Sequence, residues 1–324
     1  MRRSRDLNHY AKKIAHIIDT VEKVVVGKRQ AIVLTLTALL ARRHVLIEDV
    51  PGVGKTMLVK AIARVTGADF KRIQFTPDLL PSDVTGVSIY NQHTNAFEFR
   101  AGPVLSHILL ADEINRTSPK TQSALLEAME EGNVTVDGYT YELYEPFFVM
   151  ATQNPIEHGG TYPLPEAQLD RFLFQITLGY PSQEEELDML ERMGNGHPIA
   201  ELPAVVDIRD VRQMQREVPN VFVSEAVKQY IVAIVRETRN LDQVELGVSP
   251  RGTIALLRAA QSYAYVQGMP YVRPDDVKLL APYVLGHRLI LESDVLGPQG
   301  QAHTLIERML TRIVVPVTRK DIVK

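Results

Sequence analysis

Short apolar runs recur through the first half of the chain, at residues 44–47, 108–111 and 147–152. Such runs are typical of strands that are covered on both faces of a parallel sheet. A further strand is expected around residues 70–75. Apolar residues at helical spacing from Met57 to Thr66 predict a helix that stops before Gly67. The pattern therefore predicts an α/β core in which a parallel sheet is flanked by helices.

The second half of the chain has a helical pattern throughout. Ser182 and Glu185 form a capping box that opens a helix through Met193. Further helices are predicted at residues 224–239, 250–267, 274–285 and 302–312. We expect a boundary after Pro181, which gives N-terminal helices and an α/β core at residues 1–181 and a smaller all-helical domain at residues 182–324.

Two β-hairpins are predicted within the core. Strand-forming residues on either side of Asp137-Gly138 indicate a hairpin over residues 133–143, because Asp-Gly is a strong turn signal. The other hairpin pairs residues 87–92 with residues 96–102.

Composition narrows the functional classes. The 324 residues include no cysteine, which excludes disulfides, thiolate catalysis and cysteine-ligated metal, and the nine histidines show no paired ligand spacing. A net charge of −3 gives no general field for nucleic acid. No stretch approaches the length of a membrane span, so we expect a soluble cytoplasmic protein with no membrane insertion.

A candidate phosphate loop follows the first strand. The pattern GxxxxGK[ST] is met at Gly54, Lys55 and Thr56, although Asp49 stands where the first glycine is expected. A strand before the loop and a helix after it place unpaired backbone N–H groups where a polyphosphate would bind. Lys55 would reach the β and γ oxygens, and Thr56 would hold Mg²⁺. The predicted nucleotide-binding residues of the loop are Pro51, Gly52, Val53, Gly54, Lys55, Thr56 and Met57. The alternative is an ordinary strand-to-helix turn.

Polar residues also end two other predicted strands. Asp112 would hold Mg²⁺, while Glu113 would orient and deprotonate the attacking water. Asn154 would position the water or sense the γ-phosphate, because ligands of open α/β sheets bind at the carboxyl ends of the strands. The alternatives are that the acids serve the start of a helix and that Asn154 belongs to a turn.

Four segments together resemble the MoxR group of AAA+ ATPases: EDVPGVGKT, ILLADEINR, ATQNP and LPEAQLDRF. The resemblance runs from about Val24 to about Leu291, and in this group the first loop glycine is commonly absent. It implies that Lys55 and Thr56 belong to Walker A, and Asp112 and Glu113 to Walker B. The remaining assignments that it implies are Asn154 as first sensor, Arg171 as arginine finger, Arg251 as second sensor, and Val26 and Gly27 as the segment covering adenine.

Both arginines also have a physical rationale. A guanidinium at the γ-phosphate offsets charge in the transition state, and the alternative for Arg171 is a surface ion pair with Asp170. Ser249-Pro250 predicts a helix start, which leaves Arg251 in the first turn, where the helix dipole disfavours a cation. A bound phosphate would be its partner, and the alternative is a solvated side chain.

The resemblance implies an ATP-hydrolysing, Mg²⁺-dependent machine that forms a hexameric ring of identical chains. Its work would be chaperone-like, such as remodelling protein complexes or assisting cofactor or metal insertion, with a von Willebrand A domain protein as partner. The helical domain would form a lid over the nucleotide. The hairpins would face the central pore, with Tyr139 and Tyr141 as candidate client contacts or merely as cross-strand partners. A chelatase-type motor subunit, a nucleic-acid-dependent motor and a non-hydrolysing scaffold stay open as alternatives, and nucleic acid is disfavoured by the charge.

Overall fold

The computed structural model describes residues 2–154, 161–193, 199, 201–292 and 301–316. Its centre is a parallel five-stranded sheet with the strand order β2-β5-β8-β1-β9. The strands are β1 (His44–Glu48), β2 (Phe70–Gln74), β5 (Ile108–Asp112), β8 (Phe148–Gln153) and β9 (Phe172–Ile176). The predicted α/β core is confirmed, and the four expected strands lie within one residue of their predicted bounds. The edge strand β9 was not predicted.

Successive side chains of each strand point to opposite faces of the sheet, so the core has two layers. In β1, Val45 and Ile47 face one apolar cluster, whereas Leu46 faces the other. Both layers are covered by helices, as a parallel sheet requires. The helices of this part are α1 (Arg2–Glu22), α2 (Arg29–Leu40), α3 (Lys55–Val65), α4 (Pro81–Thr85), α5 (Pro119–Glu131) and α6 (Glu166–Leu169), with the 3-10 turn η1 (Ile114–Arg116).

The second half of the chain is helical, as predicted. Its helices are α7 (Gln183–Met193), α8 (Ile208–Glu217), α9 (Glu225–Glu237), α10 (Pro250–Val266), α11 (Pro274–Leu285) and α12 (Gln301–Leu310), with the 3-10 turns η2 (Val218–Asn220) and η3 (Gly286–Arg288). Two short strands that were not predicted, β10 (Val244–Leu246) and β11 (Ile290–Leu291), form an antiparallel ribbon among them.

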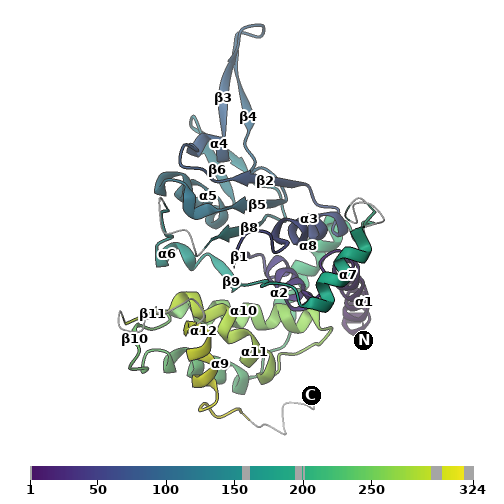
Figure 1. The fold of residues 1–324 in the computed structure, drawn as a ribbon, viewed down its shortest axis with the longest axis vertical. Helices are drawn as coiled ribbons and strands as arrows, with labels where there is room; N and C mark the ends of the chain where they lie inside the picture. The colour runs from purple at the N-terminus through teal and green to yellow at the C-terminus, as the bar shows by residue number, and fades with distance from the viewer. Residues whose placement is uncertain (1, 155–160, 194–198, 200, 293–300, 317–324) are drawn as a thin grey trace.

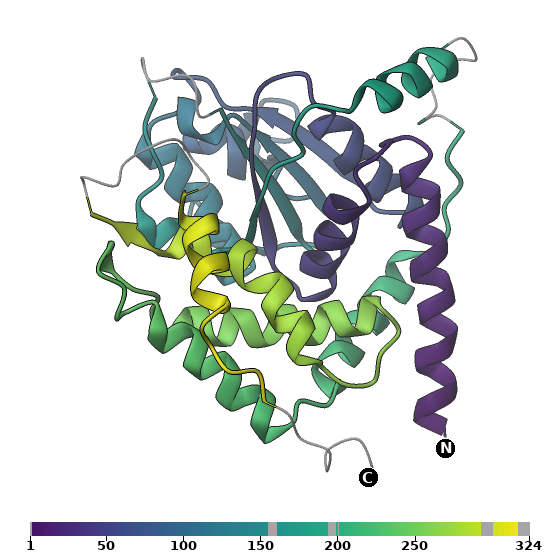
Figure 2. The ribbon, with the colours of Figure 1, turned by 60° about the horizontal axis from the view of Figure 1, so that its bottom comes forward.

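The position of this helical lid corrects one expectation. The lid was expected over the nucleotide, but α10 packs against α2 and α11 against the edge strand β9, below the sheet in Figures 1 and 2. Ser262 in α10 donates a hydrogen bond to the carbonyl oxygen of Thr37 in α2 at 2.7 Å. The segment before α8 runs along the core first, where the N–H groups of Val205 and Val206 donate to the carbonyl of Val65. The chain thus passes the C-terminal end of α3 before the helices α8 to α12 begin, and these helices do not cover the phosphate loop.

Both predicted hairpins are present. The pair β6 (Asn133–Val136) and β7 (Tyr139–Glu142) turns at Asp137 and Gly138, whose φ angles of 51° and 81° are those of a tight hairpin turn. The pair β3 (Gly86–Asn91) and β4 (Ala96–Ala101) projects far from the body (Figure 1). Among the described residues, no helix is both long and apolar enough to span a bilayer.

Candidate active site

The phosphate loop has the backbone conformation that its two inner glycines allow. Gly52 and Gly54 have φ angles of 89° and 92°, which residues with a side chain rarely adopt. A Cβ atom at either position would meet nothing within 4 Å, so the loop faces open space. Gly54 caps α3, which begins at Lys55, two residues before the predicted start. The helix therefore presents its free N–H groups to this space.

Asp49 does not point into the loop. Asp49 is 8% exposed, and its carboxylate accepts hydrogen bonds from the backbone N–H groups of Leu178 at 2.6 Å and Gly179 at 2.8 Å. It also accepts from the N–H of Val50 at 3.0 Å. The acid that replaces the consensus glycine thus ties the phosphate loop to the chain leaving β9.

The two acids after β5 are fixed by the neighbouring strand. Thr152 in β8 donates a hydrogen bond to Asp112 at 2.6 Å, and its hydroxyl oxygen accepts from the backbone N–H of Glu113 at 2.8 Å. Glu113 has a φ of 56°, an uncommon conformation that this contact supports. Thr152 orients both acids, and its position before the predicted strand tip was the only sequence signal for it.

Three further polar residues act on these acids and were missed in the sequence. Arg72 in β2 pairs with Asp112 at 2.6 Å. Gln74, also in β2, donates to Glu113 at 2.6 Å, and Arg116 donates to the same carboxylate oxygen at 2.9 Å. Arg72 and Gln74 stand two apart near the carboxyl end of β2, and this spacing in a strand next to the acids was the signal that could have identified them.

These groups surround a cleft of about 370 Å³ at the carboxyl edge of the sheet. Lys55 extends along the loop and donates to the carbonyl oxygen of Asp49 at 2.8 Å. Burial lowers the pKa of the Lys55 ammonium, while the nearby Asp112, Asp49 and Glu113 raise it. The residues that line the cleft are Pro51, Gly52, Gly54, Lys55, Thr56, Met57, Arg72, Gln74, Asp112, Glu113 and Asn154. The Walker-type residues predicted from three separate strand ends are therefore brought together.

The two predicted functional arginines lie elsewhere. Arg171 and Arg251 line a second cavity, of about 260 Å³, together with Arg43, Arg258 and Arg288. Arg171 directly precedes β9, so this cavity is at the amino edge of the sheet, opposite the cleft. Five strand residues at about 3.3 Å each separate the two edges by roughly 16 Å.

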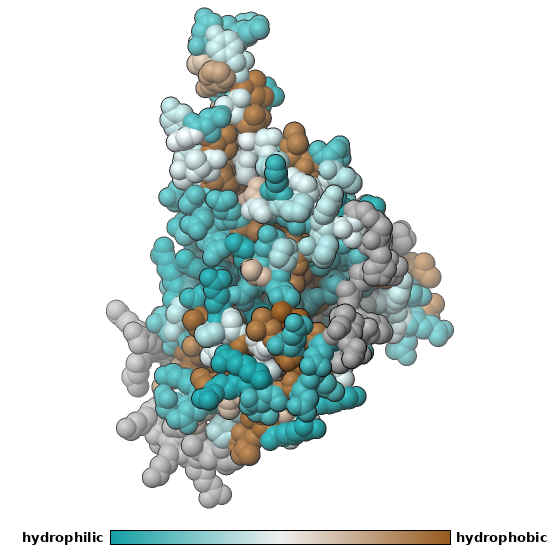
Figure 3. Space-filling view, turned by 90° about the vertical axis from the view of Figure 1, so that its left-hand side faces the viewer, coloured by the Kyte–Doolittle hydropathy of each residue, from teal (hydrophilic) through white to brown (hydrophobic). Residues whose placement is uncertain are grey.

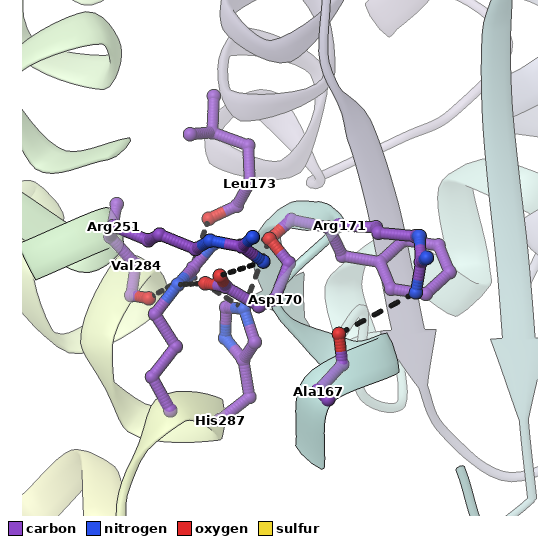
Figure 4. Close-up of polar contacts among 9 residues, drawn as sticks. Ala167, Asp170, Arg171, Leu173, Arg251, Val284 and His287 are labelled. Carbon is purple, nitrogen blue, oxygen red and sulfur yellow. Dashed lines mark hydrogen bonds and ion pairs between the residues drawn. The ribbon is translucent and has the colours of Figure 1, made fainter. Parts of the chain in front are cut away.

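The alternative of an ion pair between Asp170 and Arg171 is not found. Arg171 pairs instead with Glu130 at 2.7 Å, while Asp170 pairs with the buried Arg288 at 2.7 Å and with Arg251 at 3.9 Å. Figure 4 shows Arg251 directed toward Asp170, with the Arg171 side chain directed away from it. Arg251 lies in the first turn of α10, as predicted, and its side chain is 74% exposed.

Comparison with known proteins decides the family. Residues 44–174 match the ATPase family associated with various cellular activities (AAA), and residues 236–309 match the AAA lid domain. Chaperone MoxR1 of Mycobacterium tuberculosis is 46% identical over 305 residues, which are 91% of this chain and 80% of that protein. The chain belongs to the MoxR family of AAA+ ATPases. Protein MoxR of Paracoccus denitrificans is 31% identical over 90% of this chain and 93% of its own length.

A solved structure shares the fold over nearly the whole chain. A crystal structure of a protein from Cytophaga hutchinsonii superposes with a TM-score of 0.90 at 41% identity and covers 98% of both chains. The uncharacterized protein YeaC of Bacillus subtilis is 58% identical over 94% of this chain and 95% of its own length.

Val26 and Gly27 were predicted to cover the adenine, and the structure places Gly27 against Glu185 near the start of α7. A Cβ atom on Gly27 would collide with the side chain of Glu185, and Gly27 has a φ of 71°. The adjacent Lys28 donates to the carbonyl oxygen of Tyr180 at 3.1 Å. Tyr180 directly follows the two amides that Asp49 holds, so a continuous series of contacts links this segment to the phosphate loop.

Proposed function

We propose that this MoxR-family protein hydrolyses ATP with Mg²⁺ at sites that are shared between neighbouring subunits of a ring. The observation that carries the proposal is the separation of the site into two halves. Lys55, Asp112 and Glu113 line the cleft at one edge of the sheet, while Arg171 and Arg251 line a cavity at the other. Two halves that cannot meet within one chain can meet between copies arranged head to tail.

The cleft has groups that can bind the phosphates of a nucleotide and oxygen atoms that can bind a metal ion. The hydroxyl of Thr56 and the carboxylate of Asp112 are the hard oxygen ligands that Mg²⁺ prefers, and the open loop at Gly52 and Gly54 leaves room for phosphate oxygens. The metal supplies positive charge that offsets the charge of the phosphates. Lys55 adds charge on the same side.

The chain's own residues divide the remaining chemistry. Glu113, held by Gln74 and Arg116, accepts the proton of the attacking water. Asn154 is 6% exposed, lines the cleft and positions the water or the γ-phosphate. Arg171 of the neighbouring subunit stabilises the transition-state charge, and Arg251 acts from the same side as a sensor.

The ring would use the conformational change that ATP hydrolysis drives to act on a protein client. Hydrophobic residues follow the projecting β3–β4 hairpin (Figure 3), where Phe97 is 74% and Tyr90 49% exposed. On the other hairpin Tyr139 is 70% exposed, whereas Tyr141 stacks on Phe99 with 3.9 Å between ring centroids and so joins the two hairpins. Of the two tyrosines, Tyr139 is therefore the better placed to contact a client.

The cellular role rests on kinship with MoxR proteins. We expect a hexamer that remodels or matures protein complexes in the cytoplasm, including cofactor or metal insertion, with a von Willebrand A domain protein as partner. We place the ATPase core in residues 1–181 and the lid in residues 182–324. The segment that matches the AAA lid domain, residues 236–309, falls within the second range.

Steady-state hydrolysis measured against protein concentration tests the proposal. Specific activity should rise with concentration as rings form. Glu113→Gln should lower the turnover rate by about 10²- to 10⁴-fold and leave binding of a fluorescent ATP analogue intact. Activity that is independent of concentration, or that survives Glu113→Gln, would overturn the shared site or the assigned base, respectively.

A further inference from the structure

Helix α7 has an apolar side that the described residues leave uncovered. Leu187 and Leu190 are 55% and 69% exposed and stand three residues apart, so they lie on one side of the helix. Glu184, Glu186 and Glu191 are exposed on the same helix. In Figure 2 the helix stands clear of the body of the molecule. An amphipathic helix with exposed leucines indicates a contact with another surface.

A groove elsewhere on the molecule carries positive charge and is therefore complementary to the glutamates of α7. It has a volume of about 440 Å³ and lies between the α2–β1 turn, η2 and α10. Arg42, Arg43, Arg216 and Arg258 line it, and none of its lining residues is acidic. Its apolar lining residues are Leu40, Ala41, Val218 and Pro219. We refer to it as the arginine groove.

Hydrogen bonds hold the walls of the arginine groove together. Gln215 donates to the carbonyl oxygen of Leu39 at 2.7 Å and so joins α8 to α2. Gln261 in α10 donates to the carbonyl oxygens of Pro219 at 3.2 Å and Val221 at 2.9 Å. The walls of the groove are therefore fixed by the fold, and its arginines extend from these walls.

The positive charge of the groove is only partly offset. Arg42 reaches Glu145 at 3.9 Å, but within the described parts of the chain no carboxylate lies at ion-pair distance from Arg43, Arg216 or Arg258. Burial and the nearby Arg258 lower the pKa of the Arg43 guanidinium, while the carboxylates of Asp170 and Glu130 raise it. Like charges held close together on a rigid scaffold favour an acidic ligand.

The helix and the groove lie on opposite edges of the sheet. The chain leaves the carboxyl end of β9 to form α7, whereas Arg42 and Arg43 directly precede the amino end of β1. The groove also shares Arg43 and Arg258 with the cavity that contains Arg171. Helix α7 thus lies beside the cleft, and the arginine groove lies beside Arg171. In a head-to-tail ring that brings the cleft of one copy to Arg171 of the next, α7 of the first copy would also approach the groove of the next.

We propose that α7 of one copy docks in the arginine groove of the next copy. Its glutamates pair with Arg216 and Arg258, and Leu187 and Leu190 cover the apolar part of the groove. The inference rests on the proposed ring and names a surface that holds its subunits together.

Charge reversal tests the docking in the full chain with ATP present. Glu191→Arg and Arg216→Glu should each weaken assembly at least about tenfold, as close interfacial charge pairs do, and the double variant should restore it. Sedimentation velocity measures the assembly. Arg236→Glu is the matched control, because it makes the same charge change on an exposed arginine of α9 outside the groove. Leu190→Ser should weaken assembly as well, since Leu190 is exposed within one chain.

The docking would be overturned if Arg216→Glu and Leu190→Ser assembled as well as the control Arg236→Glu. The groove would be a small-anion site instead if Arg216→Glu lost binding of inorganic pyrophosphate while assembling normally, which also overturns it. The proposed function is judged separately, because loss of hydrolysis in Arg171→Ala rings supports the shared site whatever α7 contacts.

Discussion

The carboxylate of Asp49 accepts three backbone hydrogen bonds at the point where the phosphate loop begins. A glycine there would give the loop more conformational freedom, but it would leave the N–H groups of Leu178 and Gly179 without this acceptor. Buried donors that lose a charged acceptor are costly. The residue that departs from the consensus therefore has a structural role, which a motif comparison cannot show because Leu178 and Gly179 are far away in sequence.

We expect Asp49→Gly, which restores the consensus, to lower the free energy of unfolding by about 2 kcal/mol or more. The affinity for ATP should fall with it, because the loop loses its tie to the chain after β9. Urea unfolding and binding of a fluorescent nucleotide measure the two effects. Asp49→Asn keeps one acceptor oxygen and should lose less, and a stabilised glycine variant would contradict the role assigned to Asp49.

His44 predicts a pH dependence of stability. It is 4% exposed, its Nδ1 accepts from the N–H of Val149 at 3.0 Å, and burial lowers its pKa from 6.5 to about 4. Between these values the unfolded chain binds a proton that the folded chain does not bind. The free energy of unfolding should therefore fall by about 3 kcal/mol as the pH decreases from 6.5 to 4.

Urea unfolding at several pH values checks this slope. His44→Asn, which retains an acceptor for Val149, should give a shallower slope. His93→Asn changes an exposed histidine at the tip of the β3–β4 hairpin and should leave the slope as it is. An equal slope in wild type and His44→Asn would show that other groups govern the acid sensitivity.

At the scale of elements, local sequence patterns predicted the strands and turns whose formation depends on neighbouring residues. The buried strands β1, β5 and β8 follow from their apolar runs, and the hairpin turn follows from Asp137-Gly138. The edge strand β9 was missed because Phe172 to Ile176 directly follows a motif that was interpreted only for its chemistry. The strands β10 and β11 were missed because they are very short and pair across a long separation in the chain.

The position of the lid depends on contacts that no local pattern encodes. Arg288 is almost fully buried at the lid–core boundary, where it pairs with Asp170 and donates to the carbonyl of Phe172 at 2.8 Å. Sequence alone offered Asp170 as a partner for Arg171, which is adjacent, and did not indicate a lid residue over a hundred positions away. The error about the lid followed from the same limitation.

Arg288→Ala should destabilise the chain by about 3–5 kcal/mol, because it leaves the carboxylate of Asp170 without its buried partner. Hydrogen exchange should increase most in η3 and α11, because η3 contains Arg288 and packs against α11. Arg288→Lys should recover only part of the loss, since an ammonium cannot reproduce the fork of a guanidinium. Unchanged stability in Arg288→Ala would show that other contacts hold the lid and would contradict the role assigned to Arg288.

At the scale of the whole molecule, the sheet itself separates the two halves of the site. The structure gathers most of the predicted nucleotide-site residues around one cleft, although Val53 does not line it, since parallel strands bring their carboxyl ends together. Their roles in catalysis stay a prediction. Whether Arg171 serves its own subunit was not decidable from the sequence. The parallel pairing of β9 with β1 places Arg171 at the edge away from Lys55, and this geometry supports our proposal that Arg171 serves a second copy.

Mixing two inactive variants tests this central claim most directly. Arg171→Ala should slow hydrolysis by about 10³-fold or more, and Glu113→Gln should also be inactive, while both still bind ATP and assemble. In an equal mixture, an interface between an intact Glu113 and an intact Arg171 forms at about a quarter of the sites of a head-to-tail ring. We predict that hydrolysis returns to about that fraction of wild-type activity. A mixed assembly that stays inactive would contradict the shared site.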